Sequence, residues 1–426
     1  MNELTCVILN AVLYTYLFYN RWKKEKTLSL SIIMLGFWSI SALGAIYYEP
    51  INIFGHKGVI TMLPYFYLFV CNILFFIPVF RYDYNCIKNI QSNDKLVYVI
   101  CIIIGLLALY PLVINITYLV RHLDTVGYSS LIDNFQDRYD DQSLTYYYMD
   151  SICYRLTRYS HYLWTVSLVL LFYIPLSKIR NKKICYITLI IGIANLFVES
   201  INIMARFSLV IYFIIIFTVY ILFKHLYNEK IKAKINKVIL ALGIGLLSVF
   251  AVITIVRLEF RNETRINQVS EDAYVMQYLS EGMGNFNANM FHADYQTNRD
   301  VFTSAFNFYI LKQGEMASDR EMSTLRFGFQ SYLFYTLVGD FCRGYGIYFS
   351  FIIILLICLF FSYTLQATSY TTLSNILLFV YYIRLPLTGM FYNTYAATPI
   401  EAVSIPMFVI LFKLFEQQKK KKFYGV

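Results

Sequence analysis

The sequence predicts an all-α protein that crosses a membrane many times. Of its 426 residues, 58% are hydrophobic and 15% are charged, whereas a soluble domain carries about 25% charged residues. Apolar stretches of about 20 residues, the length that a helix needs to cross a bilayer core, recur along the chain. Helices are expected because open strands would leave backbone groups unpaired in lipid. This composition excludes a soluble multi-domain enzyme, a disordered chain and a disulfide scaffold.

Eleven apolar stretches are expected to be membrane spans. The tenth is the shortest of them. A further apolar segment, 327–338, is too short for an ordinary span, and we interpret it as a re-entrant or interfacial helix. If it crossed the membrane, the bundle would have twelve spans and the C-terminus would lie on the opposite side. The expected spans are 4–20, 28–47, 59–80, 96–120, 159–176, 184–203, 207–223, 238–256, 347–365, 370–384 and 399–415.

The distribution of Lys and Arg predicts the orientation of these spans. Alternate short loops are rich in Lys and Arg, with the exception of 366–369, which has none, and the short loops between them carry one such residue each, Lys57, Arg206 and Arg384. Because positive short loops stay in the cytoplasm, the N-terminus is expected outside and the C-terminus inside. The positive segments are 21–26, 81–95, 177–183, 224–237 and the tail 413–426.

The domain prediction is a single integral membrane domain, 1–426, with two long outer loops at 121–158 and 257–346. Within the second loop, 274–279 and 301–311 have the pattern of short amphipathic helices. The net charge of +10 is explained largely by the membrane-flanking loops, so nucleic acid is not expected as a partner. Membrane lipids are the expected partners.

The two sides of the membrane differ in the kind of positive residue. The inner loops carry mostly Lys, whereas the outer side carries mostly Arg. Orientation requires positive charge alone, but a guanidinium also grips phosphate with two parallel hydrogen bonds. The alternative is that these Arg residues pair with acids in the same loops. The residues predicted to bind the pyrophosphate or the glycan are Arg257, Arg261, Arg326, Arg343 and Arg384, together with Glu199, and Arg206 is placed where an outer-leaflet headgroup lies.

Ionisable residues also stand at the outer ends of expected spans. Glu199 lies near the outer end of the sixth, Arg206 opens the seventh, Arg384 ends the tenth and Glu401 begins the eleventh. Such groups are costly in a membrane and usually face a protein interior or a wet cavity. Glu199 and Arg206 flank a tight turn, so a structural ion pair is the alternative interpretation.

Asp340 and Arg343 stand in a glycine-rich segment, 338–346, that leads into the ninth span. On one turn of helix they would share a side. A carboxylate that accepts a proton would then lie beside a cation that holds a leaving phosphate. Asp340 and Arg206 are the predicted catalytic residues. The chain lacks a CxxC pair, a His cluster and an Asp-x-Asp pair, so no metal or cofactor is expected.

With these residues in place, the layout resembles that of the Wzy-type O-antigen and capsule polymerases. Such chains carry Lys in cytosolic loops, Arg in outer loops and one large late loop. Residues 327–351, with Gly339-Asp340-Phe341 and later glycines, are similar to the turn that often precedes one of their spans. Residues 204–209 resemble the turn that opens a central span. The Arg-x10-Gly pattern of some members is absent here.

The resemblance implies a fold of the GT-C-like membrane glycosyltransferase type in the bacterial inner membrane. It also implies transfer of a glycan from an undecaprenyl-pyrophosphate carrier onto another chain, giving O-antigen of lipopolysaccharide or capsule. A chain-length regulator protein is a possible partner. The alternatives are an O-antigen ligase, for which His292 is the late-loop histidine, and a lipid-linked oligosaccharide flippase or other transporter.

Overall fold

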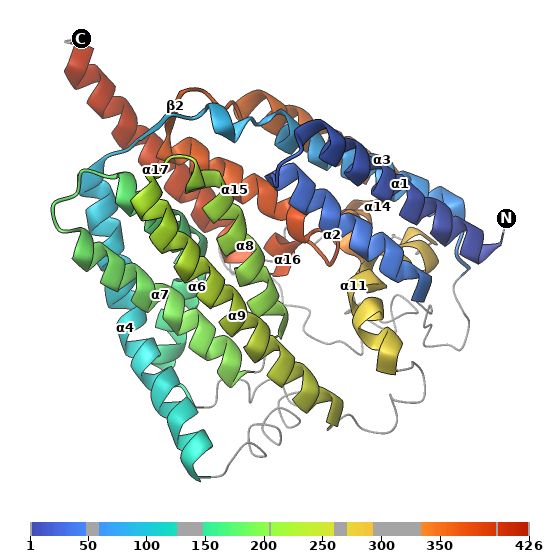
Figure 1. The fold of residues 1–426 in the computed structure, drawn as a ribbon, viewed down its shortest axis with the longest axis horizontal. Helices are drawn as coiled ribbons and strands as arrows, with labels where there is room; N and C mark the ends of the chain where they lie inside the picture. The colour runs from blue at the N-terminus through green and yellow to red at the C-terminus, as the bar shows by residue number, and fades with distance from the viewer. Residues whose placement is uncertain are drawn as a thin grey trace. The chain divides into compact units, whose positions relative to one another are not determined.

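The computed structural model describes residues 2–47, 59–125, 148–203, 206–259, 271–292, 334–397 and 399–424. Over these ranges the regular structure is helical apart from one pair of three-residue strands, which confirms the all-α prediction (Figure 1). The chain divides into two compact units that are each assembled from distant segments. The first comprises Met1–Asp83, Ile266–Ala367 and Phe379–Ala402, and the second comprises Tyr84–Arg265, Thr368–Leu378 and Val403–Val426.

All eleven predicted spans correspond to helices. Seven helices among the described residues are long and apolar enough to cross a membrane: α2, α3, α4, α6, α7, α9 and α14. The apolar helices α8 and α15 are shorter, and α1 and α17 fall outside this set. The chain is therefore a multi-pass membrane protein by the length and apolarity of its helices. The bounds are α1 Glu3–Glu25, α2 Leu30–Gly44, α3 Met62–Arg81, α4 Asp94–Thr125, α6 Ser151–Tyr173, α7 Lys182–Asn202, α8 Arg206–Lys224, α9 Glu229–Glu259, α14 Thr336–Thr364, α15 Leu373–Thr388 and α17 Pro399–Tyr424.

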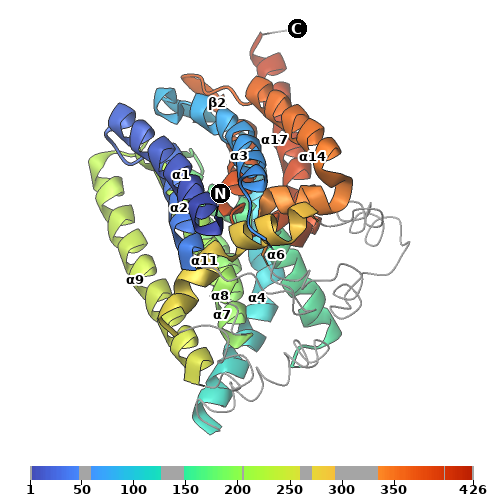
Figure 2. The ribbon, with the colours of Figure 1, turned by 90° about the vertical axis from the view of Figure 1, so that its right-hand side faces the viewer.

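In the first unit, α1, α2 and α3 lie side by side, as both ribbon views show (Figures 1 and 2). Large aromatic side chains fill the space between them. Tyr14 stacks on Trp38 with ring centroids 5.7 Å apart, and the Tyr14 hydroxyl accepts a hydrogen bond from Asn72 at 2.6 Å. The Trp38 indole N–H donates to the carbonyl of Pro386 in α15 at 2.7 Å. These bonds give the Tyr14 hydroxyl and the Trp38 N–H a partner within the buried layer.

The large late loop is shorter and more structured than the sequence predicts. Helix α11, Glu271–Ala288, is followed by the 3-10 turn η5, Met290–His292. Ser280, Met283 and Phe286 in α11 are completely buried. This half of α11 therefore packs inside the first unit. The predicted amphipathic segment 274–279 lies mainly in the other half, where the side chains up to residue 278 are outside the described ones, so that interpretation stays a prediction. The other predicted segment, 301–311, lies outside the described residues.

One correction in this loop concerns 338–346, which is helix rather than a turn. Helix α14 begins at Thr336, eleven residues before the predicted span, and its helical geometry is interrupted at Gly346, where φ is 72° and ψ is 171°. Only glycine adopts that conformation readily. Gly339 instead permits close packing, because a Cβ there would lie 2.8 Å from the Cβ of Tyr335.

In the second unit, α4, α6 and α7 form a tight group. A Cβ on Gly105 of α4 would lie 2.5 Å from the Cβ of Thr188 in α7, so the glycine lets these two helices approach closely. The predicted outer loop 121–158 is shortened at both ends, because α4 continues to Thr125 and α6 begins at Ser151. Residues 126–147 lie outside the described ranges.

One end of the second unit gathers segments from several predicted inner loops. Strand β1, Asn89–Gln91, pairs in parallel with β2, Tyr370–Thr372, with Ile90 opposite Thr371. The Lys178 N–H donates to Asp94 at 3.2 Å, and His225 hydrogen bonds to the carbonyl of Ile87 at 3.0 Å. The connections before α4, α7, α9 and α15 therefore meet at one end of the helices.

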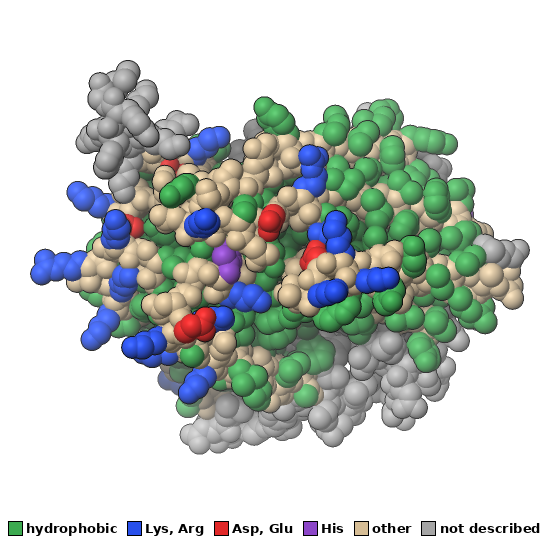
Figure 3. Space-filling view, turned by 45° about the horizontal axis from the view of Figure 1, so that its top comes forward, with side chains coloured by type: hydrophobic (Ala, Val, Ile, Leu, Met, Phe, Trp, Pro, Cys, Tyr) green, Lys and Arg blue, Asp and Glu red, His purple; other side chains and the backbone are tan. Residues whose placement is uncertain are grey.

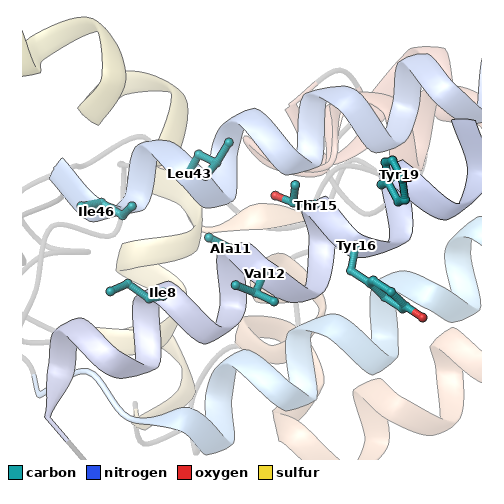
Figure 4. A pocket seen from close by; sticks show the side chains of 8 residues that line it. All are labelled: Ile8, Ala11, Val12, Thr15, Tyr16, Tyr19, Leu43 and Ile46. Carbon is teal, nitrogen blue, oxygen red and sulfur yellow. The ribbon is translucent and has the colours of Figure 1, made fainter.

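Helices α1 and α2 also form an apolar pocket on the first unit (Figure 4). The apolar side chains that line it are between 43% and 65% exposed at Ile8, Val12, Tyr16, Tyr19, Leu43 and Ile46. A contiguous apolar surface of this kind is what a helix presents to lipid. Figure 3 shows the same contrast on one face, where Lys and Arg side chains project beside extensive hydrophobic surface.

Candidate functional site

Asp340 and Arg343 form the centre of a polar site in the first unit. They stand three residues apart in α14, ahead of the interruption at Gly346, and Arg343 Nη2 lies 3.4 Å from Asp340 Oδ1. The prediction that one helical turn would place them on one side is confirmed. The side chain of Asp340 is 6% exposed and that of Arg343 is 22% exposed. The carboxylate is therefore enclosed, whereas part of the guanidinium reaches the surface.

The segment that follows α15 holds this carboxylate in place. The backbone N–H of Asn393 donates to Asp340 Oδ2 at 2.6 Å. Two further bonds join the same segment to the start of α14: the Thr336 N–H donates to the Phe391 carbonyl at 2.8 Å, and the Leu337 N–H donates to the Gly389 carbonyl at 2.6 Å. The first N–H groups of a helix have no partner within the helix, so this segment satisfies them and fixes the position of Asp340.

Arg384 and Glu401 form a second ion pair in the same unit. Arg384 in α15 and Glu401 in α17 are 3% and 1% exposed, and Arg384 Nη1 donates to Glu401 Oε2. The Arg384 guanidinium also lies 5.1 Å from the centre of the Tyr395 ring, within the range of a cation–π interaction. Both residues were singled out at span ends, and the structure brings them together.

A chain of contacts connects the two ion pairs. Asn393, whose N–H binds Asp340, accepts a hydrogen bond from the N–H of Tyr395 at 3.1 Å. The ring of Tyr395 then contacts Arg384, which pairs with Glu401. We call these residues the Asp340 network: Arg343, Asp340, Asn393, Tyr395, Arg384 and Glu401.

Glu199 lies in the second unit and contacts a different partner from the one considered. Its Oε2 lies 2.6 Å from Nε2 of His161 in α6, and its carboxylate is 1% exposed. The alternative of a Glu199–Arg206 ion pair stays a prediction. Arg206 begins α8, and its side chain is outside the described residues.

The structure leaves the remaining predicted ligands without a described position for their side chains. Arg257 belongs to α9, but its side chain is not among those described. Arg261 and Arg326 lie outside the described ranges altogether. For these three residues, both the phosphate interpretation and the alternative of pairing with loop acids stay predictions.

Two members of the Asp340 network were missed at the sequence level. Asn393 acts through its backbone N–H, which the side-chain type does not reveal. Tyr395 is one of 40 tyrosines, most of which are expected at membrane interfaces or facing lipid. An Asn-Thr pair ahead of a helix was the available signal, because Asn and Thr favour helix N-termini. Here Asn393 directly precedes α16, Thr394–Ala397, and Thr394 is its first residue.

The arrangement provides an enclosed carboxylate beside a partly exposed guanidinium. Such a pair suits proton acceptance next to an anion. Among the described residues there is no group of His, Cys, Asp and Glu that would hold a metal ion. Comparison of the chain with protein-family models, with curated proteins and with solved structures gives no match.

Proposed function

We propose that this protein polymerises lipid-linked oligosaccharides on the outer face of a bacterial inner membrane. The observation that carries the proposal is the Asp340–Arg343 pair, an enclosed carboxylate whose partner is a partly exposed guanidinium. The donor would be a glycan on undecaprenyl pyrophosphate, and the acceptor would be a hydroxyl of a second glycan. The product would be O-antigen or capsular polysaccharide.

The proposed reaction assigns one task to each residue of the pair. Asp340 accepts the proton of the acceptor hydroxyl while that oxygen forms a bond to the anomeric carbon. The bond between this carbon and the phosphate oxygen breaks, and the pyrophosphate leaves with the electron pair. Arg343 stabilises the charge that develops on the departing phosphate. No nucleotide or metal is needed, because the carrier activates the sugar.

The arrangement of loops in the second unit supports the proposed orientation. The segments near Ile87, Lys178, His225 and Thr371 meet at one end, and all four lie in or beside predicted inner loops. An even number of crossings must then separate His225 from Thr371. Helices α9 and α14 provide two, as the eleven-span arrangement requires. Residues 327–333 lie outside the described ranges, so the interpretation of 327–338 as a re-entrant or interfacial helix stays a prediction.

The alternative of a lipid-linked oligosaccharide transporter has one feature in its favour. Helix α14 is interrupted at Gly346, and interrupted helices often form the substrate sites of transporters. The Asp340–Arg343 pair, however, lies directly before the interruption. Its carboxylate and guanidinium suit acid–base chemistry as well as substrate binding. The two functions differ in the glycan that accumulates, and the following experiment uses that difference.

The test is a length profile of surface glycan, resolved by gel electrophoresis, from cells with and without the chain. Carrier-linked glycan is extracted in parallel. A polymerase leaves single repeat units on the surface when it is lost, a ligase leaves long chains on the carrier, and a transporter leaves single units trapped inside. An unchanged ladder would refute all three functions for that glycan.

The same profile tests the site in three variants. We expect Asp340→Asn to abolish the ladder at unchanged protein level, because the amide cannot accept the proton. Arg343→Lys should keep a shortened ladder, since an ammonium retains the charge and loses the planar fork. Glu229→Gln is the matched control, because Glu229 is exposed and pairs with Lys232 on the surface of α9. Normal ladders in both site variants would contradict the assignment.

A further inference from the structure

A second polar cluster lies within the second unit, apart from the Asp340 network. Asn195, Glu199 and Asn202 recur at helical spacing along one face of α7. Asn115 of α4 and His161 of α6 face them through hydrogen bonds. Asn195 and Asn115 are completely buried, and Glu199 and Asn202 are 1% exposed. So many buried polar side chains in apolar helices are costly to keep.

The hydrogen bonds of this cluster determine which way each amide points. Asn202 Nδ2 donates to the backbone carbonyl of Asn115 at 3.0 Å. A carbonyl only accepts, so the Asn202 atom must be the nitrogen. That nitrogen also lies 3.3 Å from Asn115 Oδ1. The same oxygen accepts a hydrogen bond from the Tyr148 hydroxyl at 2.8 Å. The other arm of the Asn115 amide is therefore its nitrogen, which donates to Asn195 Oδ1 at 2.9 Å.

Asn195 and Glu199 each keep one polar atom that these assignments do not use. Among the described residues, Asn195 Nδ2 and Glu199 Oε1 are buried and have no hydrogen-bond partner. They belong to residues four apart on α7, so they lie one helical turn from each other. Buried polar groups in proteins nearly always have a partner, and exceptions point to a function or to a bound molecule. The His161 side chain is 29% exposed, so the edge of the cluster reaches the surface.

The pair of unpartnered atoms has a definite chemical preference. Asn195 Nδ2 offers a donor and Glu199 Oε1 offers an acceptor. A metal cation would be repelled by the amide N–H groups, and an anion would be repelled by the carboxylate. A hydroxyl both donates and accepts. Two neighbouring hydroxyls of a sugar ring would place one group on each atom.

We propose that Asn195 and Glu199 form a binding site for two neighbouring hydroxyl groups of a sugar. The second unit would thus recognise a pair of hydroxyl groups of the substrate. That the substrate is a glycan rests on the proposed polymerase function. His161 serves as a positioning residue, because its bond to Oε2 holds the carboxylate with Oε1 available. Asn115 holds the amide of Asn195 in the matching orientation.

The test measures sugar binding by the full chain in lipid nanodiscs. The probes are the methyl glycosides of glucose, galactose, mannose, rhamnose and N-acetylglucosamine, followed by saturation-transfer NMR. Sorbitol at the same concentration controls for non-specific contact. We expect at least one glycoside to bind above sorbitol. Signals equal to those of sorbitol for all five would overturn the proposal.

Two site variants and one control then locate the binding. Glu199→Gln should place its oxygen toward His161 and present an N–H where Oε1 was, and Asn195→Leu removes the donor. Each should weaken binding by about fivefold or more, as expected for one lost hydrogen bond. Asn72→Leu, at a buried amide of the first unit, should bind as the original chain does. Each variant is first shown to retain a cooperative thermal transition.

The outcomes separate this proposal from the proposed function. Equal binding by the original chain and Glu199→Gln would overturn the sugar site, whatever the glycan ladder shows. Displacement of the glycoside by sodium chloride would also overturn it, because it would identify a cation site. Suppose that sugar binding depends on Glu199 but the glycan ladder is unchanged in cells that lack the protein. That result would support the sugar site and refute the polymerase function.

Discussion

At the residue scale, the Arg384–Glu401 pair is the most demanding interaction of the Asp340 network. Both side chains are almost fully buried, so removal of one partner leaves an isolated charge. We expect Glu401→Gln to destabilise the protein by about 3–5 kcal/mol, the usual cost of breaking a buried pair. Thermal unfolding in detergent micelles measures this loss, and Glu229→Gln, at an exposed pair, should stay within about 1 kcal/mol.

The double variant Arg384→Met with Glu401→Leu separates stability from function. Apolar residues of similar volume often replace a buried ion pair without loss of stability, so we expect an unfolding temperature near that of the original chain. The glycan ladder should nevertheless be lost or shortened, because the network no longer holds Tyr395 and Asn393 beside Asp340. A stable double variant with a normal ladder would show that this ion pair is structural alone.

The sequence identified the charged members of this network and missed the neutral ones. Asp340, Arg343, Arg384 and Glu401 stand out because ionisable groups are rare in apolar stretches. Which charge meets which was not predictable, since α14, α15 and α17 come together only in the folded unit. The same reason explains Glu199, whose partner His161 lies 38 positions earlier in the chain.

At the element scale, the interruption of α14 depends on one glycine. Gly346 has φ 72° and ψ 171°, a region that is strained by about 1–3 kcal/mol for other residues. We expect Gly346→Ala to lower the stability by that amount. Gly245→Ala in α9 is the matched control, because a Cβ there meets nothing within 4 Å and alanine favours helix by about 1 kcal/mol. Equal effects at the two positions would contradict the strained geometry.

A second element-scale prediction concerns the start of α15. Glu416 accepts hydrogen bonds from the N–H and hydroxyl of Ser374 at 3.3 and 2.6 Å. Burial raises the pKa of Glu416 above its ordinary value of 4.5, although these hydrogen bonds oppose the shift. A carboxyl with a raised pKa binds its proton more tightly when folded. Its contribution to stability is therefore present below pH 4.5 and is lost as the pH rises through the raised pKa.

Glu416→Gln tests this linkage, because glutamine does not titrate and its oxygen accepts a hydrogen bond from the Ser374 hydroxyl at every pH. The unfolding temperature of the variant minus that of the original chain should become more positive as the pH rises from 4 to 8. Melting curves in detergent at each pH measure the difference. A constant difference over this range would show that Glu416 does not titrate differently in the folded and unfolded states.

The elements themselves were largely predictable, and their local irregularities were not. Each of the eleven spans predicted from apolar length corresponds to a helix, because bilayer thickness fixes the length of a span. The pairing of Ile90 with Thr371 joins residues too far apart for any local pattern to show. The early start of α14 was missed because Gly339 and Gly344 suggest a turn, whereas close packing against Tyr335 and neighbouring residues is what requires a small residue at 339.

At the scale of the whole molecule, the arrangement of the loops makes the orientation testable with a native cysteine. Of the eight cysteines, Cys86 is partly exposed and the other seven are buried. Cys86 lies in the predicted inner loop 81–95, next to the strands that gather the inner connections of the second unit. A membrane-impermeant maleimide should therefore leave intact spheroplasts unlabelled and label Cys86 after permeabilisation.

Arg121→Cys in a Cys86→Ser background is the converse probe, because Arg121 is exposed near the predicted outer end of α4. This cysteine should be labelled in intact spheroplasts. Labelling of Cys86 from outside would show that the bundle has the opposite orientation, with the Lys-rich loops that we predict to be inner lying outside. It would also move the Asp340 network to the cytoplasmic side, where a polymerase of surface glycan could not use it.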